Sequence, residues 1–420
     1  MNLTKEEQEI YDGKHGETLA KVLRTVVSYG ELFGAERLVS LDKPVHLVTS
    51  FGVTMLKPLY RIMDELVESG LKAKMPFTVD PRPLDNENLS DNFFEKLLFK
   101  IVYGKQRSYE QQLMAVGLKD LKAFSCACYM EEVGNVPEKG DILAWAESSA
   151  VVYANSVIGA RSNRTSAIID LFCGILGKTP EFGLLTDEGR KADWIIHVDA
   201  HALPPAQVLG SAVGIKVQEG VPYIRGLDKL LIGLTDIQIR DYLKDMGAAA
   251  ASSGAVGLFH VEGITPEASE QRESLIRKEA SEYHIDENEI ERIKSAYPVL
   301  WKKMNAAPDI CFIGCPHLSV RQLEEWTDLL FNSIKQKGLS KLKVKTVLTA
   351  APDVIDKFRQ NPERYKKLKS TGARLSSTCP LMVMSNPLYK KKNVITNSNK
   401  LRTYTSARYY NDNEILNLIT

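Results

Sequence analysis

The sequence lacks the features of membrane-spanning, secreted and nucleic-acid-binding proteins. No apolar run approaches the ~18–20 residues that cross a bilayer, and the polar, glutamate-rich first residues do not resemble a signal peptide. The formal net charge is +1, so no overall field attracts nucleic acid or an anionic membrane. We therefore expect a cytoplasmic protein that binds neither.

Several common catalytic and nucleotide-binding motifs are also missing. No Gly-x-Gly-x-x-Gly follows a predicted strand, and there is neither a Gly-x-Ser-x-Gly elbow nor a His-Glu-x-x-His pair. Residues 174–179 resemble a phosphate-binding loop, but Phe172 stands where that loop needs its first glycine. His197 and His201 are four residues apart, a spacing more typical of a surface pair than of a metal site. These absences argue against nucleotide-binding enzymes, serine hydrolases and zinc proteases.

The six cysteines contain no Cys-x-x-Cys pair, which weakens a structural zinc site. Disulfides are not expected in a large cytoplasmic chain, so each cysteine is a metal ligand, a nucleophile or a buried apolar residue. Cys173 and Cys311 lie in apolar runs and are assigned to packing. Cys315 and Cys379 each precede a proline at a predicted strand or loop junction, where α/β proteins place their sites. The residues alone leave the ligand and nucleophile alternatives open.

The 420 residues exceed the ~250–300 that one core supports, so at least two domains are expected. Predicted strands at 194–198, 309–313 and 344–349 alternate with helices such as 17–33 and 319–335, which predicts an α/β fold. The polar segment 265–288 is the best candidate for a boundary. We therefore divide the chain provisionally into α/β regions 1–265, with Cys126, and 266–420, with Cys315 and Cys379.

A dense polar block lies between Glu147 and Arg164, with four serines, two asparagines and two arginines among small residues. On a helix, Ser148 and Asn155 share a face. A buried helix with capping side chains is one interpretation. We favour a carboxylate-binding surface that includes Asn155, Arg161 and Arg164, because the guanidinium fork pairs with carboxylates in a bidentate manner.

Long segments of the chain resemble the aconitase X family. They include LTKEEQEIYDGKHG, GNVPEKG, AWAESSAVVYANSVIGARSNR, FHVEGITPEA, GCPHLS, STCPLMV and ITNSNK, spread over nearly the whole sequence. The resemblance implies stacked three-layer α/β domains, like the large part of aconitase, around an iron–sulfur cluster. It implies a hydro-lyase that dehydrates a small hydroxy acid, either cis-3-hydroxy-L-proline or (R)-5-phosphomevalonate. It also implies a small swivelling β-domain, here a separate subunit, because the chain resembles the large subunit of the split type.

Site residues carried over by the resemblance match individual positions of this sequence. The cluster, 4Fe–4S or 2Fe–2S, is expected on Cys126, Cys315 and Cys379. The expected catalytic residues are Glu147, Ser148 and Lys400, and further contacts to the carboxylate substrate fall on Ser50, Asp80 and Pro81.

The aspartate at position 80 bears on the choice of substrate. Asp80 suits an amine and would repel a phosphate, which favours cis-3-hydroxy-L-proline. Two alternatives of other classes stay open. One is a non-catalytic zinc-binding protein, and the other is a hydrolase with Cys315 as nucleophile and His317 as base.

Overall fold

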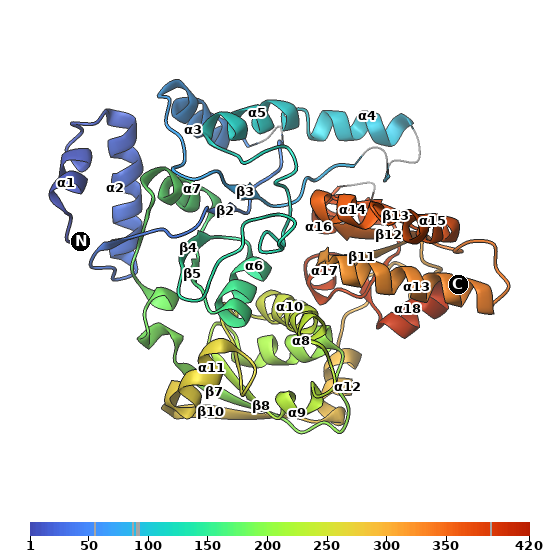
Figure 1. Ribbon diagram of the computed structural model, residues 1–420. Helices are drawn as coiled ribbons and strands as arrows, with labels where there is room; N and C mark the ends of the chain where they lie inside the picture. Colours follow the sequence, from blue (N-terminus) through green and yellow to red (C-terminus); the bar gives the residue numbers. More distant parts are fainter. Residues whose placement is uncertain (54–55, 86–87, 90–92, 387–388) are drawn as a thin grey trace.

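The computed structural model describes residues 1–53, 56–85, 88–89, 93–386 and 389–420. Its three main sheets are entirely parallel, and helices connect their strands (Figure 1). Parallel sheets are stable when helices cover both faces, so strands buried on both sides are expected. The predicted α/β class, with stacked α/β domains, is confirmed.

The first sheet has the strand order β3-β2-β4-β5, and a separate antiparallel pair joins β1 to β6. Its core is formed largely by α2, α3, α5 and α7, whose apolar faces pack together. The elements of this part are α1 (Lys5–Tyr11), α2 (Glu17–Leu32), β1 (Leu38–Ser40), β2 (His46–Leu47), α3 (Lys57–Glu68), β3 (Thr78–Val79), α4 (Phe93–Val102), α5 (Gln106–Val116), β4 (Ile142–Trp145), α6 (Ser148–Tyr153), a π-helix (Ala154–Ile158), β5 (Arg161–Arg164), α7 (Ala167–Leu176) and β6 (Lys178–Pro180).

The second sheet has the order β10-β7-β8-β9. Helices α8 and α10 lie against each other at close range, because a Cβ on Gly210 would come within 2.0 Å of the Met246 carbonyl oxygen. Helix α8 also lies close to the Ala/Gly-rich segment that begins at Gly247, because a Cβ on Gly214 would come within 2.4 Å of the Ala250 carbonyl oxygen. The elements are β7 (Ala192–Val198), α8 (Ala206–Val217), β8 (Pro222–Arg225), α9 (Leu227–Leu230), α10 (Asp236–Ser253), β9 (His260–Val261), α11 (Pro266–Gln271), β10 (Ile276–Ile285) and α12 (Glu287–Ser295), with short 3₁₀ turns at Gly183–Leu185, Glu188–Arg190 and Arg272–Leu275.

The third sheet has the order β13-β12-β11-β14-β15, and its central strand β11 is buried along its whole length. Figure 1 shows this sheet and its helices on the opposite side of the molecule from α1 and α2. The elements are β11 (Ile310–Leu318), α13 (Val320–Gln336), β12 (Lys345–Ala350), α14 (Pro352–Arg359), α15 (Pro362–Thr371), β13 (Arg374–Ser376), α16 (Pro380–Met384), a 3₁₀ turn (Tyr389–Lys391), β14 (Val394–Thr396), α17 (Asn399–Tyr404), β15 (Arg408–Tyr409) and α18 (Asp412–Ile419).

Local signals in the sequence account for many element ends. Thr4 caps α1 and Ser319 caps α13, each in a reciprocal capping box, as their sequences predict. The provisional division after residue 265 stays a prediction, and the second sheet takes strands from both sides of that point. No helix in the described part of the chain is both long and apolar enough to cross a bilayer.

The buried side chain of Arg190 forms an ion pair within the second part of the chain and also contacts the first part. Arg190 is 1% exposed and donates to both carboxylate oxygens of Glu267, at 2.7 and 2.8 Å. Its guanidinium also donates to the backbone oxygens of Asn155 and Leu184. Removing one member of such a pair leaves an uncompensated buried charge, which typically costs about 3–5 kcal/mol.

We predict that Asp170 makes the stability of the protein fall as pH rises. Asp170 is fully buried in α7, and burial raises the pKa of its carboxyl to about 8. An unfolded aspartate titrates near about 3.9, so between about pH 4 and pH 8 the folded state holds a proton that the unfolded chain has lost. The melting temperature of Asp170→Asn should therefore decline less over this window than that of the wild type.

The control is Asp187→Asn, which changes an exposed aspartate. This variant should keep the wild-type pH slope. A slope in Asp170→Asn equal to that of the wild type would show that Asp170 releases its proton at ordinary pH in the folded protein.

Candidate active site

A cavity of about 370 Å³ lies where segments of all three parts of the chain meet. Its volume falls in the usual range of small-molecule sites. It is lined by Val48, Ser50, Phe51, Asp80, Pro81, Cys126, Ala146, Glu147, Ser148, Arg164, Gly254, Gly314, Cys315, Pro316, His317, Cys379, Pro380, Leu381, Met382, Lys400 and Tyr404.

Three cysteines reach this cavity from three separate segments. Cys126 follows the isolated β-bridge between Val79 and Phe124, Cys315 lies near the end of β11, and Cys379 directly precedes α16. The Cys379 N–H donates to the Arg82 carbonyl at 2.9 Å, which fixes its loop against the first part of the chain. Cys128, Cys173 and Cys311 are fully buried in the hydrophobic cores instead. The structure therefore separates one group of three cavity-lining cysteines from three packed ones.

Gly314 gives β11 the turn that presents Cys315. Its φ of 106° lies in the region that favours glycine, and a Cβ would come within 2.5 Å of the Thr349 carbonyl oxygen. The Thr349 hydroxyl donates to the Gly314 carbonyl and braces the turn from β12. The Ser398 hydroxyl donates to the Cys315 carbonyl from the start of α17.

His317 connects the three cysteine segments. Its Nε2 lies 3.2 Å from the Thr378 carbonyl, which only accepts, so this nitrogen carries the proton and Nδ1 accepts from the Ser125 hydroxyl at 3.2 Å. The His317 backbone N–H donates to the Cys126 sulfur at 3.4 Å. Burial lowers the pKa of His317 to about 4, so the ring is neutral at pH 7. Its partners are Cys126, the adjacent Ser125, and Thr378, which precedes Cys379. His317 therefore fixes the positions of these two loops relative to its own segment, which contains Cys315.

The three thiols are positioned as candidate ligands for more than one metal atom. Burial raises the pKa of each of them, so they stay protonated unless a metal replaces the proton. Among the described residues, the only group of three possible ligands within 4.8 Å of one another lies elsewhere. Sulfurs around one tetrahedral zinc lie about 3.8 Å apart, from bonds of about 2.3 Å. At least one pair of the cavity sulfurs is therefore more than 4.8 Å apart.

Glu147 and Lys400 form a buried ion pair at the side of the cavity. Glu147 caps α6: its carboxylate accepts from the Ala150 N–H at 2.7 Å and from the Ser149 hydroxyl at 2.6 Å. The Lys400 ammonium, near the start of α17, donates to the other carboxylate oxygen. Burial alone would raise the pKa of Glu147, but Lys400 and these hydrogen bonds lower it. Glu147 and nearby groups raise the pKa of Lys400 despite burial, so both members are charged.

Asp80 and His46 form a second pair below the cavity. The Asp80 carboxylate lies 3.5 Å from His46 Nε2, and His46 Nδ1 lies 2.8 Å from the Thr78 hydroxyl. Burial raises the pKa of Asp80 to about 6, although His46 opposes the shift. Asp80 is therefore mostly ionised at pH 7 and places a negative charge at the cavity wall.

The remaining predicted residues differ in their surroundings. The Ser50 hydroxyl donates to the Pro81 carbonyl at 2.6 Å, and Gln106 holds the Ser50–Gly52 turn through both its amide atoms. Ser148 begins α6 at the cavity wall. Arg164 ends β5 and is exposed, and its guanidinium has no hydrogen bond or ion pair with any residue in the described ranges.

Two predicted substrate-binding residues do not reach the cavity. Asn155 is buried in the π-helix, where its amide bonds both Ser162 backbone groups and the Gly257 carbonyl. Arg161 pairs with Asp187 and donates to the Leu185 carbonyl. Their polar groups are thus used to hold β5 against neighbouring segments. The number of polar residues between Glu147 and Arg164 does not show which of them bind a ligand and which stabilise the fold.

Sequence reasoning missed several residues at or near the cavity. His317 was considered only as a partner for Cys315, and His46 and Tyr404 were not considered. The motif GCPHLS contains His317, but its partners lie about 60 and 190 residues away along the chain. No local pattern marks such contacts.

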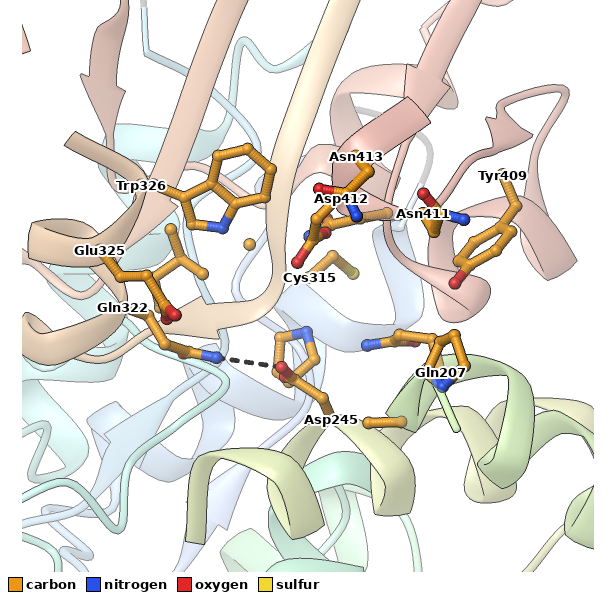
Figure 2. A pocket seen from close by; sticks show the side chains of 16 residues that line it. Gln207, Asp245, Cys315, Gln322, Glu325, Trp326, Tyr409, Asn411, Asp412 and Asn413 are labelled. Carbon is orange, nitrogen blue, oxygen red and sulfur yellow. Dashed lines mark hydrogen bonds between the residues drawn. The ribbon is translucent and has the colours of Figure 1, made fainter. Parts of the chain in front are cut away.

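A second cavity, of about 320 Å³, shares Gly314, Cys315 and Pro316 with the first. Figure 2 shows Asp245, Glu325 and Asp412 around it, with Gln322 bonded to Asp245. Of the three candidate ligands, Cys315 alone lines both cavities. The Cys315 segment therefore lies between the two cavities, where the turn at Gly314 and the Ser398 hydroxyl hold it.

Comparisons with known proteins match the chain along nearly its whole length. Family models for the first, second and third domains of aconitase X match residues 1–188, 192–295 and 308–418. The crystal structure of Thermococcus kodakaraensis aconitase X in its holo-form superposes with a TM-score of 0.81 at 28% sequence identity, covering 100% of both chains.

Curated relatives fall into two groups. The phosphomevalonate dehydratase large subunit of Methanocaldococcus jannaschii is 30% identical over 96% of this chain and 95% of its own length. That of Thermococcus kodakarensis is 31% identical over 84% of this chain and 81% of its own length. The cis-3-hydroxy-L-proline dehydratase of Pseudomonas aeruginosa is 26% identical over 95% of this chain but only 65% of its own length.

We predict that Glu147 and Lys400 depend on each other for stability. Lys400→Met leaves a buried carboxylate without its counter-ion and should lower the free energy of unfolding by about 3–5 kcal/mol. The double variant Glu147→Gln/Lys400→Met removes both charges and should recover part of the loss. Urea unfolding of the two single variants and the double variant measures the coupling energy.

The control is Lys302→Met, at an exposed lysine, which should be near neutral. A loss in the double variant equal to the sum of the two single-variant losses would show that the pair has no net coupling.

Proposed function

The chain belongs to the aconitase X family, and on this basis we propose that it is an iron–sulfur hydro-lyase subunit that dehydrates a small hydroxy acid. The observation that carries the proposal is the convergence of three thiols from distant segments on one cavity that also holds the Glu147–Lys400 pair. The dehydratase names of the relatives support the reaction class.

Cys126, Cys315 and Cys379 would hold the cluster. The donor set fits, because thiolates are the usual ligands of iron–sulfur clusters and three of them leave one iron without a protein ligand. Such an iron supplies Lewis acidity toward a leaving hydroxyl group when the cluster is bound. The lack of a Cys-x-x-Cys pair favours this group over structural zinc.

The other charged residues of the cavity would bind and orient the substrate. Arg164 has a guanidinium without a protein partner among the described residues, and Lys400 is kept cationic by Glu147, so both suit the substrate carboxylate. Neutralising that carboxylate makes the adjacent C–H more acidic, which dehydration requires. Ser148 lies where its hydroxyl can donate to the same group.

A separate small subunit would complete the site. The phosphomevalonate dehydratase relatives are named as large subunits, and the chain covers only 65% of a hydroxyproline dehydratase that it matches along most of its own length. We propose that the small subunit supplies the residue that removes the proton, and that the large subunit alone does not turn over substrate.

The cavity charges favour cis-3-hydroxy-L-proline as substrate. This amino acid is a zwitterion, with one carboxylate for Arg164 and Lys400 and one ammonium for Asp80. The cavity likewise has two anionic and two cationic side chains, those of Asp80, Glu147, Arg164 and Lys400. A phosphorylated hydroxy acid would place additional negative charge beside two carboxylates.

A second candidate is (R)-5-phosphomevalonate, and two observations favour it. The relatives with the higher identities are phosphomevalonate dehydratase large subunits. A neighbouring cavity of about 1040 Å³ shares Tyr404 with the candidate site and is lined by Lys302, Lys303, Lys390, Lys391 and Lys392. These lysines would attract an anionic substrate toward the site.

The geometry gives little support to a cysteine-nucleophile hydrolase. Both ring nitrogens of His317 are engaged, with Ser125 and Thr378, so neither is available to take a proton from Cys315. Burial also raises the pKa of the Cys315 thiol, which disfavours the nucleophilic thiolate.

We predict that the three cavity cysteines, and not the packed ones, are needed for cluster binding. After anaerobic reconstitution, wild-type protein should contain iron and acid-labile sulfide, and Cys126→Ala, Cys315→Ala and Cys379→Ala should each lose most of both. Cys128→Ala and Cys311→Ala are matched controls and should retain them. Stoichiometric zinc without sulfide in the wild type would contradict the cluster and support the zinc alternative.

We predict that Asp80 determines the substrate. With the small subunit present, wild-type enzyme should dehydrate cis-3-hydroxy-L-proline, and Asp80→Asn should lower kcat/KM about 10–100-fold, because a charge-assisted contact contributes about 1.5–3 kcal/mol. Asp187→Asn, far from the cavity lining, should leave it unchanged. Turnover of (R)-5-phosphomevalonate alone, undiminished in Asp80→Asn, would establish the second candidate.

A further inference from the structure

A second group of possible metal ligands lies on the sheet formed by β7 and β10. His197 on β7 and Glu282 and His284 on β10 offer ligand atoms that all lie within 4.8 Å of one another. The two strands are parallel neighbours in which His284 pairs with His197 and Glu282 pairs with Ile195. Because side chains alternate along a strand, Glu282 and His284 point to the same face, where His197 meets them. Figure 1 places these strands in the second part of the chain, with α11 and α12.

The separation of His197 Nε2 and the Glu282 carboxylate is that of two ligands of one metal ion. His197 Nε2 lies 3.3 Å from the Glu282 carboxylate, yet it is a buried atom without a hydrogen-bond partner among the described residues. Two ligands of one tetrahedral zinc lie about 3.3–3.4 Å apart, from bonds of about 2.0–2.1 Å. An ion between His197 and Glu282 would therefore satisfy a nitrogen that is otherwise left unpaired.

Asp199 sets the tautomer that such a site needs. It follows β7, and its carboxylate lies 2.7 Å from His284 Nδ1. The carboxylate accepts, so Nδ1 carries the proton and Nε2 keeps its lone pair for a metal. Carboxylate–histidine–metal arrangements of this kind are common in proteins, because the carboxylate orients the ring and makes it more basic.

We propose that His197, Glu282 and His284 bind a late first-row divalent cation such as Zn²⁺, with water in the remaining position. Two imidazoles and one carboxylate are the ligands that such ions favour over Mg²⁺ and Ca²⁺, which prefer oxygen alone. The ion links edge strand β10 to β7, across a pairing whose register shifts between Ile276 and Ser281. Its role is to hold this edge of the second sheet.

Binding requires one ring to turn. The two imidazoles are stacked, with centroids 4.4 Å apart and planes 9° from parallel. Lone pairs lie in the ring planes, so parallel rings cannot both point at one ion. The His284 and Asp199 side chains are 63% and 53% exposed, so both have room to turn together and the ring can leave the stack while its Nδ1 keeps the Asp199 carboxylate.

The test measures zinc binding by the anaerobically prepared protein at graded free zinc concentrations, with bound zinc determined by elemental analysis beside iron. The wild type should bind one more equivalent of zinc than His284→Ala, and zinc should raise the melting temperature of the wild type more than that of His284→Ala. Any zinc held by the cavity cysteines is common to both proteins, so the difference isolates this site.

Two further variants sharpen the result. Asp199→Asn keeps all three ligands but weakens the orienting contact, so zinc affinity should fall about 10–100-fold. His201→Ala removes a nearby exposed histidine outside the group and should bind like the wild type. Equal zinc content and equal thermal shifts in wild type, His284→Ala and Asp199→Asn would overturn the proposal, whatever the enzyme's activity.

Discussion

The buried pair of Glu147 and Lys400 is the interaction on which the candidate site depends. Glu147 belongs to the segment between β4 and α6, and Lys400 to α17 in the third part of the chain, so the pair joins parts that are about 250 residues apart. Desolvating two charges is costly, and a pair of apolar residues would often hold such a junction as well. What apolar residues could not provide is a permanent cation beside three thiols. The pair is therefore better explained by the chemistry of the cavity than by stability.

His317 contacts the segments of all three candidate cysteine ligands. Cys126 belongs to the first part of the chain, and Cys315 and Cys379 belong to separate segments of the third. A neutral imidazole has one donor and one acceptor, and here each contacts the residue next to a different cysteine. The low pKa that burial imposes on His317 preserves this asymmetry, because an imidazolium would have two donors and could not accept from Ser125. The thiols can thus be arranged before any metal arrives.

The sequence predicted features that depend on neighbouring residues and missed those that depend on distant ones. Alternating strands and helices, the caps at Thr4 and Ser319 and the packing of Cys173 and Cys311 follow from local patterns, and the structure confirms them. The family resemblance named nine of the 21 residues that line the cavity. Asn155 and Arg161 were expected there because of composition alone, but folding turned them toward β5 and its neighbours. The role of His317 arises only when strands distant in sequence meet.

The charge balance of the cavity limits what this chain can do alone. Glu147 is committed to Lys400, Asp80 faces His46, and His317 has no free nitrogen, so none of the three is well placed to accept a proton from a substrate. Arg164 and Lys400 can neutralise a carboxylate, and Asp80 can hold an ammonium group, which are binding functions. Among the described residues that line the cavity, each of these carboxylates and imidazoles is already engaged, which favours a base from outside the chain. The arrangement of charges thus supports the proposal that a second subunit completes the active site, beside the support from the names of the relatives.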